Sequence, residues 1–393
     1  MDLRGDEKPL SVCMLISSFF PVTGGTERQC QELAASLLKA GVDVAVLTRK
    51  RKGLQAFELI EGIPVHRVPA PGKGMIASLS YQLFSLLWLR RHRGRYRILH
   101  AHQALSPALI AALARILFPE TRTIVKITST GETSDFRLGR AKLLFPIRRQ
   151  LLRAIDTFVV LTESMRADLH QYGLGAAKIV KIPSMLDVSR FCPTSPKLKN
   201  RQRLDLGLPP EKKIVIHTGR DEPPKDLVTL LEAWALLPPR RREEAYLLIV
   251  GSSDPNRWET LAAQRGIQGT LSVRRMCGNI HEYLQTSDVL VLASTSEGLP
   301  NAVLEGLACG LPVVASDVGG VREVVQDQRE GILVPPKDPA ALASALDRVL
   351  VDSLLATDLG RQGRMLAETR FSLDIVTELY LALYRSLLNG GDL

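Results

Sequence analysis

The feature of this 393-residue sequence that most limits its fold is a repeated alternation of short apolar runs with glycine-containing loops and helix-patterned segments. The apolar run LSVCMLIS (10–17) is followed by the loop FFPVTGGTE, by the helical pattern RQCQELAASLLKAG and by a second apolar run, VDVAVLT (42–48). Short apolar runs joined by helices are typical of parallel strands that are buried on both faces of a sheet. The sequence therefore predicts an α/β fold built on parallel sheets.

The same alternation begins again in the second half of the chain. KIVIHTG (213–219) and AYLLIVGS are predicted strands, and the segment KDLVTLLEAWALL between them has helical spacing. The segment FCPTSPKLKNRQR (191–203) is rich in Pro, Ser and Lys and interrupts the alternation, so we place the linker there. The length also suits two domains better than one core. We therefore expect two Rossmann-like domains that face a cleft, covering residues 1–195 and 196–370.

Charge is distributed unevenly along the chain. Residues 1–195 carry a net charge of +13 and the remaining residues carry −3, which together make the total of +10. A basic first half is compatible with an anionic membrane surface, with nucleic acid or with a merely soluble surface. The sequence contains no recognisable nucleic-acid-binding module, so we expect no nucleic-acid partner.

The cysteines and the first residues indicate the compartment. The five cysteines are scattered and form no CxxC pair, which argues against a disulfide framework or a zinc site and for a reducing compartment. The first segment, MDLRGDEKPL, places acids before the apolar run and does not match a secretion signal. The longest apolar run, 78–89, is well short of the ~20 residues that span a bilayer. We therefore expect a cytoplasmic protein.

Two glutamates, Glu297 and Glu305, flank the turn GLPN (298–301), which joins the predicted strand DVLVLAS to a predicted helix. Gly298 allows the backbone to approach a ligand, and Asn301 can cap the helix, whose first amides suit a phosphate. Glu305, about one turn inside the helix, can accept hydrogen bonds from the two hydroxyls of a ribose. Glu297 lies at the carboxyl end of a strand, where open α/β sheets bind ligands. The alternative is that both glutamates are solvated charges.

Together with GLPVVASDVGGVREVV after them, these residues resemble the retaining GT-B glycosyltransferases of family 4, the glycosyl transferases group 1. The signature of that family is a pair of glutamates separated by seven residues, which Glu297 and Glu305 match. The resemblance extends over nearly the whole chain, from PVTGGTERQC to RFSLDIVTELYLALYRSLL. It implies a GT-B fold whose last helix, within residues 371–393, crosses back to the N-terminal domain.

The resemblance also implies roles for individual residues. Glu305 would hold the ribose of a nucleotide-sugar donor, and Glu297 would reach the transferred sugar, as a positioning group or as a nucleophile. Arg220 and Lys225, in HTGRDEPPKD, match the family's basic pair, and fixed cations are needed because negative charge grows on the leaving diphosphate; otherwise both are surface cations. The donor-binding residues implied are Gly24, Gly25, Gly219, Gly298, Leu299, Pro300, Asn301, Ala302 and Glu305. The family needs no metal or cofactor.

The sequence departs from the family pattern in three places. The stretch TIVKITSTGE lacks the family's histidine, so its acceptor-side role cannot be transferred. His100 and His102 lie two apart on a predicted strand and face the same side, which leaves an acceptor-side or metal role for His102 open beside simple packing. Ser184 and Arg275 replace an asparagine and a glycine of the family pattern. The base and the sugar are therefore open, and a UDP-sugar is preferred over a GDP-sugar.

The expected reaction is transfer to a glycan or lipid-linked acceptor in cell-surface glycan biosynthesis. Two basic segments with apolar residues, YQLFSLLWLRRHRGRYR (81–97) and RLGRAKLLFPIRRQLLR (137–153), suit an anionic membrane surface, although their apolar positions could instead pack on the sheet. A Rossmann dehydrogenase would need GxGxxG after the first strand, which PVTGGTE does not supply. A catalytically silent nucleotide-sugar-binding protein remains the alternative.

Overall fold

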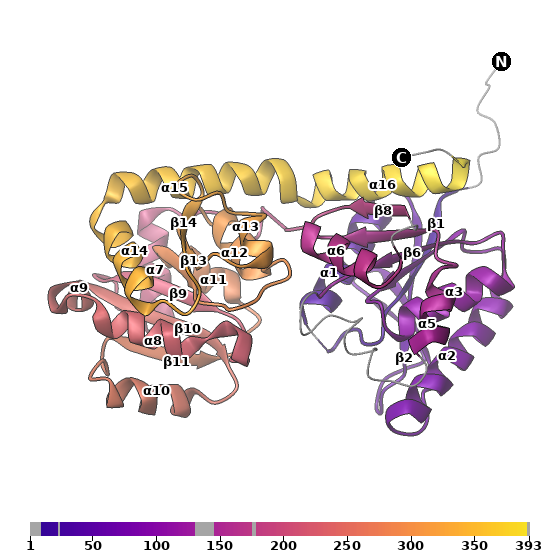
Figure 1. Ribbon diagram of the computed structural model, residues 1–393, viewed down its shortest axis with the longest axis horizontal. Coiled ribbons are helices and arrows are strands. Elements are labelled where there is room, and N and C mark those ends of the chain that lie inside the picture. Colours follow the sequence, from indigo (N-terminus) through magenta and orange to yellow (C-terminus); the bar gives the residue numbers. More distant parts are fainter. Residues whose placement is uncertain (1–8, 23, 130–144, 175–177, 391–393) are drawn as a thin grey trace, which may run out of the picture. The chain divides into compact units, whose positions relative to one another are not determined.

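The computed structural model describes residues 9–22, 24–129, 145–174 and 178–390 (Figure 1). The chain divides into two compact units: the first comprises Met1–Met185 and Leu373–Leu393, and the second comprises Leu186–Ser372. Part of the TIVKITSTGE stretch and residues 137–144 of the second basic segment lie outside the described residues.

The first unit contains an eight-stranded sheet with the order β3-β4-β2-β1-β5-β6-β7-β8. All neighbouring strands are parallel except β3 and β4, which are antiparallel. The order reverses between β1 and β5, which is the switch point of a doubly wound sheet. The strands are β1 Ser11–Leu15, β2 Asp43–Arg49, β3 Phe57–Ile60, β4 Ile63–Val68, β5 Ile98–His102, β6 Arg122–Lys126, β7 Thr157–Val160 and β8 Lys178–Lys181.

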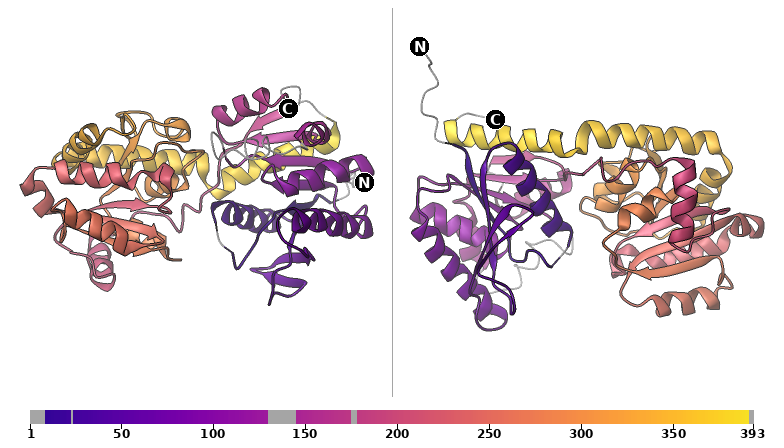
Figure 2. Two further views of the ribbon diagram at one scale, coloured as in Figure 1. Left: turned by 60° about the horizontal axis from the view of Figure 1, so that its bottom comes forward. Right: turned by 180° about the vertical axis from the view of Figure 1, so that it is seen from behind.

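Helices cover both faces of this sheet because the strands are apolar on both sides. The C-terminal helix α16, drawn in yellow, lies against the first sheet in every view (Figures 1 and 2). Val376, Tyr380 and Tyr384 of α16 are fully buried in one cluster with Val12 and Met14 of β1, so the prediction that the last helix returns to the N-terminal domain is confirmed. The helices are α1 Gly25–Lys39, α2 Gly74–Arg91, α3 Ser106–Leu117, α5 Phe145–Leu152, α6 Glu163–Gln171 and α16 Leu373–Asn389.

The second unit contains a six-stranded parallel sheet with the order β11-β10-β9-β12-β13-β14, the order of a Rossmann fold. Its switch point lies between β9 and β12. The strands are β9 Lys213–Thr218, β10 Ala245–Ser252, β11 Leu271–Arg275, β12 Val289–Leu292, β13 Val313–Ser316 and β14 Gly331–Val334. The main helices are α7 Pro196–Asp205, α8 Leu227–Leu236, α9 Pro239–Glu244, α10 Pro255–Gln264, α11 Ile280–Gln285, α12 Asn301–Ala308, α13 Gly319–Arg322, α14 Pro339–Val351 and α15 Ser353–Leu366.

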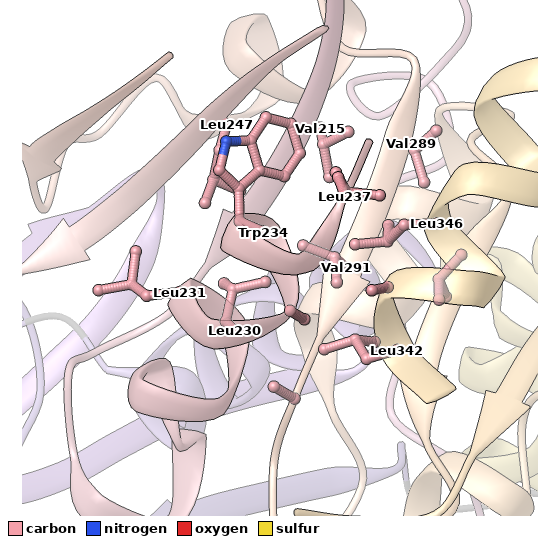
Figure 3. Packing of buried hydrophobic residues seen from close by; sticks show 14 of the residues in the cluster. Val215, Leu230, Leu231, Trp234, Leu237, Leu247, Val289, Val291, Leu342 and Leu346 are labelled. Carbon is pink, nitrogen blue, oxygen red and sulfur yellow. The ribbon is translucent and has the colours of Figure 1, made fainter. Parts of the chain in front are cut away.

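One core of the second unit is organised around Trp234 of α8. Its fully buried ring lies with Val215 of β9 and Leu247 of β10 (Figure 3). The indole Nε1 donates a 3.0 Å hydrogen bond to Thr270 Oγ1, so the polar edge of the ring is satisfied. This packing holds β9, one of the strands whose ends carry the candidate site, beside its neighbour β10.

The division between the units differs from the expected boundary at residues 195 and 196. Leu186 and Phe191 are buried in a core of the second unit, and Arg364 Nη1 donates to the carbonyls of Val188 (3.1 Å) and Phe191 (2.8 Å). The segment expected to be a linker contains α7, whose first turn is capped by Ser195 through a 3.4 Å bond from the Leu198 amide. Proline and serine here mark the start of a helix rather than a flexible connection.

Two further features bear on the sequence-based expectations. Within the described residues, every helix is too short or too polar to cross a bilayer. All five cysteines have free thiols.

Candidate functional site

Three loops meet at the carboxyl edge of the second sheet, where the strand order reverses. They follow β9, β12 and β13, which are neighbours in the sheet. The amide of Thr295, after β12, donates to the carbonyl of Pro224, after β9 (2.8 Å). The amide of Gly320, after β13, donates to the carbonyl of Glu297 (3.1 Å). Backbone hydrogen bonds therefore hold together the loops at the position where open α/β sheets bind ligands.

Glycines allow two of these loops to touch backbone to backbone. A Cβ on Gly320 would lie 1.4 Å from the carbonyl oxygen of Gly298. A Cβ on Gly319, which has φ +34°, would lie 2.4 Å from the carbonyl oxygen of Glu297. Both distances are far below a van der Waals contact, and the opposing atoms are backbone. The second glycine pair in the sequence is therefore a packing requirement of the loop that carries Glu297.

The predicted residues Lys225 and Glu297 form an ion pair at this edge. Lys225 Nζ lies 2.6 Å from Glu297 Oε1, and Ser294 Oγ donates a second 2.6 Å hydrogen bond to the same oxygen. The two side chains are only 20% and 10% exposed, so the pair is largely withdrawn from water. Charge pairs at such sites are screened less than pairs on the surface.

A buried histidine lies close to the ion pair. His217, near the end of β9, is 0% exposed. Burial, together with the nearby positive charge of Lys225, lowers the pKa of His217 to about 3. The ring is therefore neutral at physiological pH, and Lys225 is the cation at this position.

Arg220 follows the strand end but does not share the ion pair. Its side chain is 72% exposed and pairs with Glu222 at 3.0 Å. The preceding residue, Gly219, has φ +145°, and a Cβ on the neighbouring Gly251 would lie 2.3 Å from the Gly219 carbonyl oxygen. The turn that begins the loop is thus tightly packed against β10, whereas the guanidinium of Arg220 is available to solvent.

Asp221 fastens this loop to the loop after β10. Its carboxylate accepts hydrogen bonds from Ser252 Oγ (2.7 Å), from the amide and hydroxyl of Ser253 (3.0 and 2.8 Å) and from Trp258 Nε1 (3.1 Å). Burial alone would raise the pKa of Asp221, but these hydrogen bonds hold that pKa well below its usual range. Asp221 therefore fixes the backbone between the two predicted cations.

The helix α12 carries the second predicted glutamate. Glu305 is 7% exposed. Asn301 was expected to cap this helix, but it is the first helical residue, and Pro300 occupies the N-cap position without a side-chain hydrogen bond. Proline fits here because its φ of −76° is compatible with the turn. The first amides of α12, at Asn301 and Ala302, are consequently not occupied by a capping side chain.

In the first unit, the predicted residues occupy two different environments. Gly24 is the N-cap of α1 and Gly25 is its first residue, so the predicted glycine loop lies at the carboxyl end of β1. His102 is 0% exposed and stacks on His100 with ring centroids 4.5 Å apart. Nδ1 of His100 lies 2.8 Å from the hydroxyl of Tyr384 in α16. The packing alternative fits His102, because a fully buried ring does not reach a substrate.

The sequence predicted both members of the ion pair but not the residues that hold them in position. Lys225 and Glu297 were both predicted. Ser294 was not, although a polar residue directly after a buried strand is a usable signal. Asp221 and Gly320 were also missed as site residues, because a hydrogen-bond acceptor and a close backbone contact leave no pattern in one sequence. Among the described residues, no group of three or more His, Cys, Asp or Glu could hold a metal ion.

Comparisons with known proteins agree for both units. Residues 199–365 match the family described as glycosyl transferases group 1, and residues 24–184 match the glycosyl transferase 4-like domain. A D-inositol 3-phosphate glycosyltransferase of Streptomyces bingchenggensis is 30% identical over 98% of this chain and 91% of its own length. An enzyme with the same name from Corynebacterium urealyticum is 29% identical over 93% of this chain and 91% of its own length.

Solved structures share the fold over nearly the whole chain. Sucrose-phosphate synthase of Thermosynechococcus elongatus superposes with a TM-score of 0.82 at 23% identity, covering 97% of this chain and 100% of that one. The Anabaena protein HepE, solved in complex with UDP-glucose, superposes with a TM-score of 0.78 at 18% identity, covering 96% of this chain and 100% of that one. At these identities the likeness concerns the fold.

Proposed function

The chain belongs to the glycosyl transferases group 1 family, and from that premise we propose that it transfers a sugar from a nucleoside-diphosphate sugar to an acceptor hydroxyl with retention of anomeric configuration. The observation that carries this proposal is the ion pair between Lys225 Nζ and Glu297 Oε1, 2.6 Å apart at the carboxyl edge of the second sheet. It combines a cation and a carboxylate in a largely dry position at the strand switch point, where a nucleotide ligand binds in this type of sheet.

The donor's diphosphate would be bound by positive charge and by amides. Breaking the bond between sugar and phosphate leaves negative charge on the diphosphate, which Lys225 and Arg220 would neutralise. The exposed guanidinium of Arg220 can exchange Glu222 for a phosphate because a surface ion pair is weak. The uncapped amides of α12, at Asn301 and Ala302, would add the positive end of a helix.

The two glutamates would then divide the rest of the donor between them. Glu297 is held by Lys225 and Ser294 and would position the transferred sugar. The hydrogen bonds from Ser294 and Lys225 fix the orientation of its carboxyl group, which suits a positioning role. Glu305, almost buried in α12, would accept the two hydroxyls of the ribose. The departing phosphate would take the proton of the acceptor hydroxyl.

We expect the donor to be a UDP-sugar before a GDP-sugar, and no cofactor. The structural likeness to HepE, which was solved with UDP-glucose, favours testing that donor first. The acceptor we propose is a glycan or a lipid-linked molecule of cell-surface glycan assembly. The proposed place of action is the cytoplasmic side of the membrane.

A peripheral membrane contact is supported by the exposed face of α2. Tyr81, Ser85 and Leu89 face the protein interior. The opposite face exposes an apolar stripe, and the helix ends in Arg90 and Arg91. The segment is therefore apolar on both sides instead of having one charged face, and its arginines gather at the end. Apolar side chains beside arginines suit the interface of an anionic bilayer. The stripe consists of Met75, Ile76, Leu79, Leu83 and Leu87, which are between 50% and 69% exposed.

A panel of UDP-sugars and GDP-sugars tests the donor assignment. We expect one or more donors to raise the unfolding temperature, because a ligand that binds only the native state stabilises it. We also expect nucleotide release to fall by about 100-fold or more in Glu305→Gln, since a buried polar contact to the substrate is lost. Glu259→Gln, an exposed change on α10, is the matched control. Donor binding without turnover for any acceptor would favour the silent binding protein, and full turnover in Glu305→Gln would refute the site.

A further inference from the structure

The first unit has a basic edge that the proposed donor site does not use. Arg49 is the last residue of β2, and Lys50, Arg51 and Lys52 follow it directly. No acidic residue occurs between Asp43 and Glu58 in the sequence. Because β2 is parallel to β1, this basic run lies at the same carboxyl edge of the sheet as the loop after β1. Charge of one sign is thus concentrated at the edge where α/β sheets bind ligands.

The guanidinium of Arg49 is held by neutral groups. Its Nη2 donates a 3.2 Å hydrogen bond to Ser106 Oγ, which lies 2.7 Å from Ser78 Oγ. The carbon of the guanidinium lies 4.8 Å from the centre of the Tyr81 ring. Across the described residues, no carboxylate pairs with Arg49, and its buried Nε has no hydrogen-bond partner. The charge is therefore oriented without being neutralised.

Arg51, two residues after Arg49, is also held by a serine hydroxyl. Its Nη2 donates a 3.0 Å hydrogen bond to Ser18 Oγ in the loop after β1. Ser106, the partner of Arg49, is the first residue of α3, which follows β5. Since β1 lies between β2 and β5, the Arg49 side chain reaches a residue that follows β5, and Arg51 contacts the loop after β1 itself. This is the switch point of the first sheet, and no acidic side chain pairs with Arg51 in the described part of the chain either.

The backbone at this edge has further features of a binding site. Gln103, between β5 and α3, has φ +90°, which is a rare and strained conformation for a residue with a side chain. Its amide donates to the carbonyl of Lys126 at 3.1 Å, which holds the strained residue in place. The helix α3 begins without a side-chain cap, and its second residue, Pro107, has no amide hydrogen to donate. Arg148 of α5 donates to the carbonyl of Ala104 in the same connection.

From this arrangement we propose that the acceptor carries a phosphate group, which Arg49 and Arg51 bind at the carboxyl edge of the first sheet. Guanidinium groups with free donors suit phosphate because they offer several hydrogen bonds in one plane. The apolar stripe of α2 starts next to this position, since Ser78, the neighbour of Ser106, is adjacent to the exposed Leu79. The phosphate could belong to a lipid or to a soluble molecule. The inference rests on the proposed glycosyl transfer and names the class of its acceptor.

Phosphate binding to the full-length protein tests the inference. Titrations with inorganic phosphate and with pyrophosphate are made in saturating UDP, which occupies the donor site. We expect the wild type to bind the anion and the Arg49→Gln, Arg51→Gln double variant to bind it at least about tenfold more weakly, since charged hydrogen bonds are lost. Lys39→Gln, at the last turn of α1, removes one positive charge at the opposite edge, as Arg51→Gln does at this edge, and should bind as the wild type does. Equal binding by wild type and double variant would overturn the proposal.

A single variant and a UDP-binding measurement distinguish loss of the phosphate site from misfolding and from failure of the donor assignment. Arg51→Gln alone changes an exposed side chain, so a weaker anion affinity in this variant cannot be ascribed to a lost core contact. Binding of UDP, followed in the same samples, reports on the second unit. If UDP does not bind the wild type, the proposed function fails. If UDP binds but phosphate and pyrophosphate do not, only the acceptor inference fails.

Vesicles separate the two sources of phosphate. Phosphatidylcholine vesicles are prepared with phosphatidic acid or, at equal surface charge, with phosphatidylserine. A preference for phosphatidic acid that disappears in the double variant identifies a lipid phosphate. Binding of free phosphate that depends on both arginines, without any preference between the vesicles, identifies a soluble phosphorylated acceptor. Both results support the phosphate site. The proposal is refuted if the protein binds both kinds of anionic vesicle equally and if the wild type and the double variant bind phosphate equally.

Discussion

Replacing Gly320 by alanine should disable the proposed donor site through a single methyl group. The new Cβ would lie 1.4 Å from the Gly298 carbonyl oxygen, 2.5 Å from the Gly298 carbonyl carbon and 3.0 Å from Leu299 Cα. All three atoms are backbone, so no side chain can rotate away. Restoring an ordinary contact of about 3.3 Å requires the loop to move by roughly 2 Å, and a displacement of about 1 Å already costs about 100-fold in rate at a catalytic site.

The displaced segment begins directly after Glu297. A shift of this size would break the 2.6 Å contact with Lys225 and the hydrogen bond from Gly320 to the Glu297 carbonyl. We therefore expect kcat/KM to fall by about 100-fold or more. Crowding a packed site should also destabilise the second unit by about 1–3 kcal/mol.

The assay is nucleotide release at varied donor concentration, together with urea unfolding of the same preparations. Gly278→Ala is the control, because a Cβ at Gly278 would meet no atom within 4 Å. The control should retain the activity and stability of the wild type. Activity of Gly320→Ala within threefold of the control would show that the loop can relax, and would refute the argument that this contact positions Glu297.

Four further outcomes are expected. Asp221→Asn should lower kcat/KM by about tenfold, because the loop that carries Arg220 and Lys225 loses hydrogen bonds to the loop after β10, while the affinity for UDP stays unchanged. Steady-state kinetics and a UDP titration measure the two quantities, and an unchanged kcat/KM would contradict this prediction. His100 and His217 have pKa values lowered to about 3 by burial, so the stability that each provides is complete above pH 6.5 and is lost as the pH falls toward 3. Between pH 7 and pH 5 each should remove about 2 kcal/mol from the free energy of unfolding, and a flat urea-unfolding profile would refute this. Burial lowers the pKa of Lys126 to about 8, so its charged form destabilises the folded protein at pH 7. Lys126→Met should therefore raise the free energy of unfolding at pH 7 by up to about 3 kcal/mol. In the same urea-unfolding assay this gain should vanish as the pH rises toward 10.5. Leu83→Glu should weaken sedimentation with anionic vesicles without changing donor hydrolysis, and undiminished sedimentation would exclude α2 as the contact.

The fold was largely predictable because its determinants are local. Buried parallel strands need continuous apolar runs, and the helices between them need one apolar face, so both leave a periodic pattern in the sequence. The linker was misplaced for a local reason as well. The segment 191–203 has the composition of a loop, but Ser195 and Pro196 form the start of a helix, and Phe191 is buried in the second unit. Composition alone does not distinguish a helix start from a flexible connection.

The candidate site was predictable in part. Glu297 and Glu305 lie close in the sequence around one turn, so their pattern is visible there. The contact of Glu297 with Lys225 joins residues 72 positions apart, and it exists because β9 and β12 are neighbours in the sheet. The environment of His100 likewise depends on α16, which is distant in sequence and places the Tyr384 hydroxyl 2.8 Å from its Nδ1.

The two α/β units, the order of strand and helix within each, and the charged residues at the strand ends can all be read from the sequence, because they depend on local apolar periodicity and turn chemistry. Which of those residues meet depends on how the chain folds. Lys225 pairs with Glu297 while Arg220 faces solvent, and Arg49 and Arg51 lack a carboxylate partner among the described residues. The physical reason is that sheet order and backbone contact, such as that between Gly320 and Gly298, set distances between residues far apart in the chain.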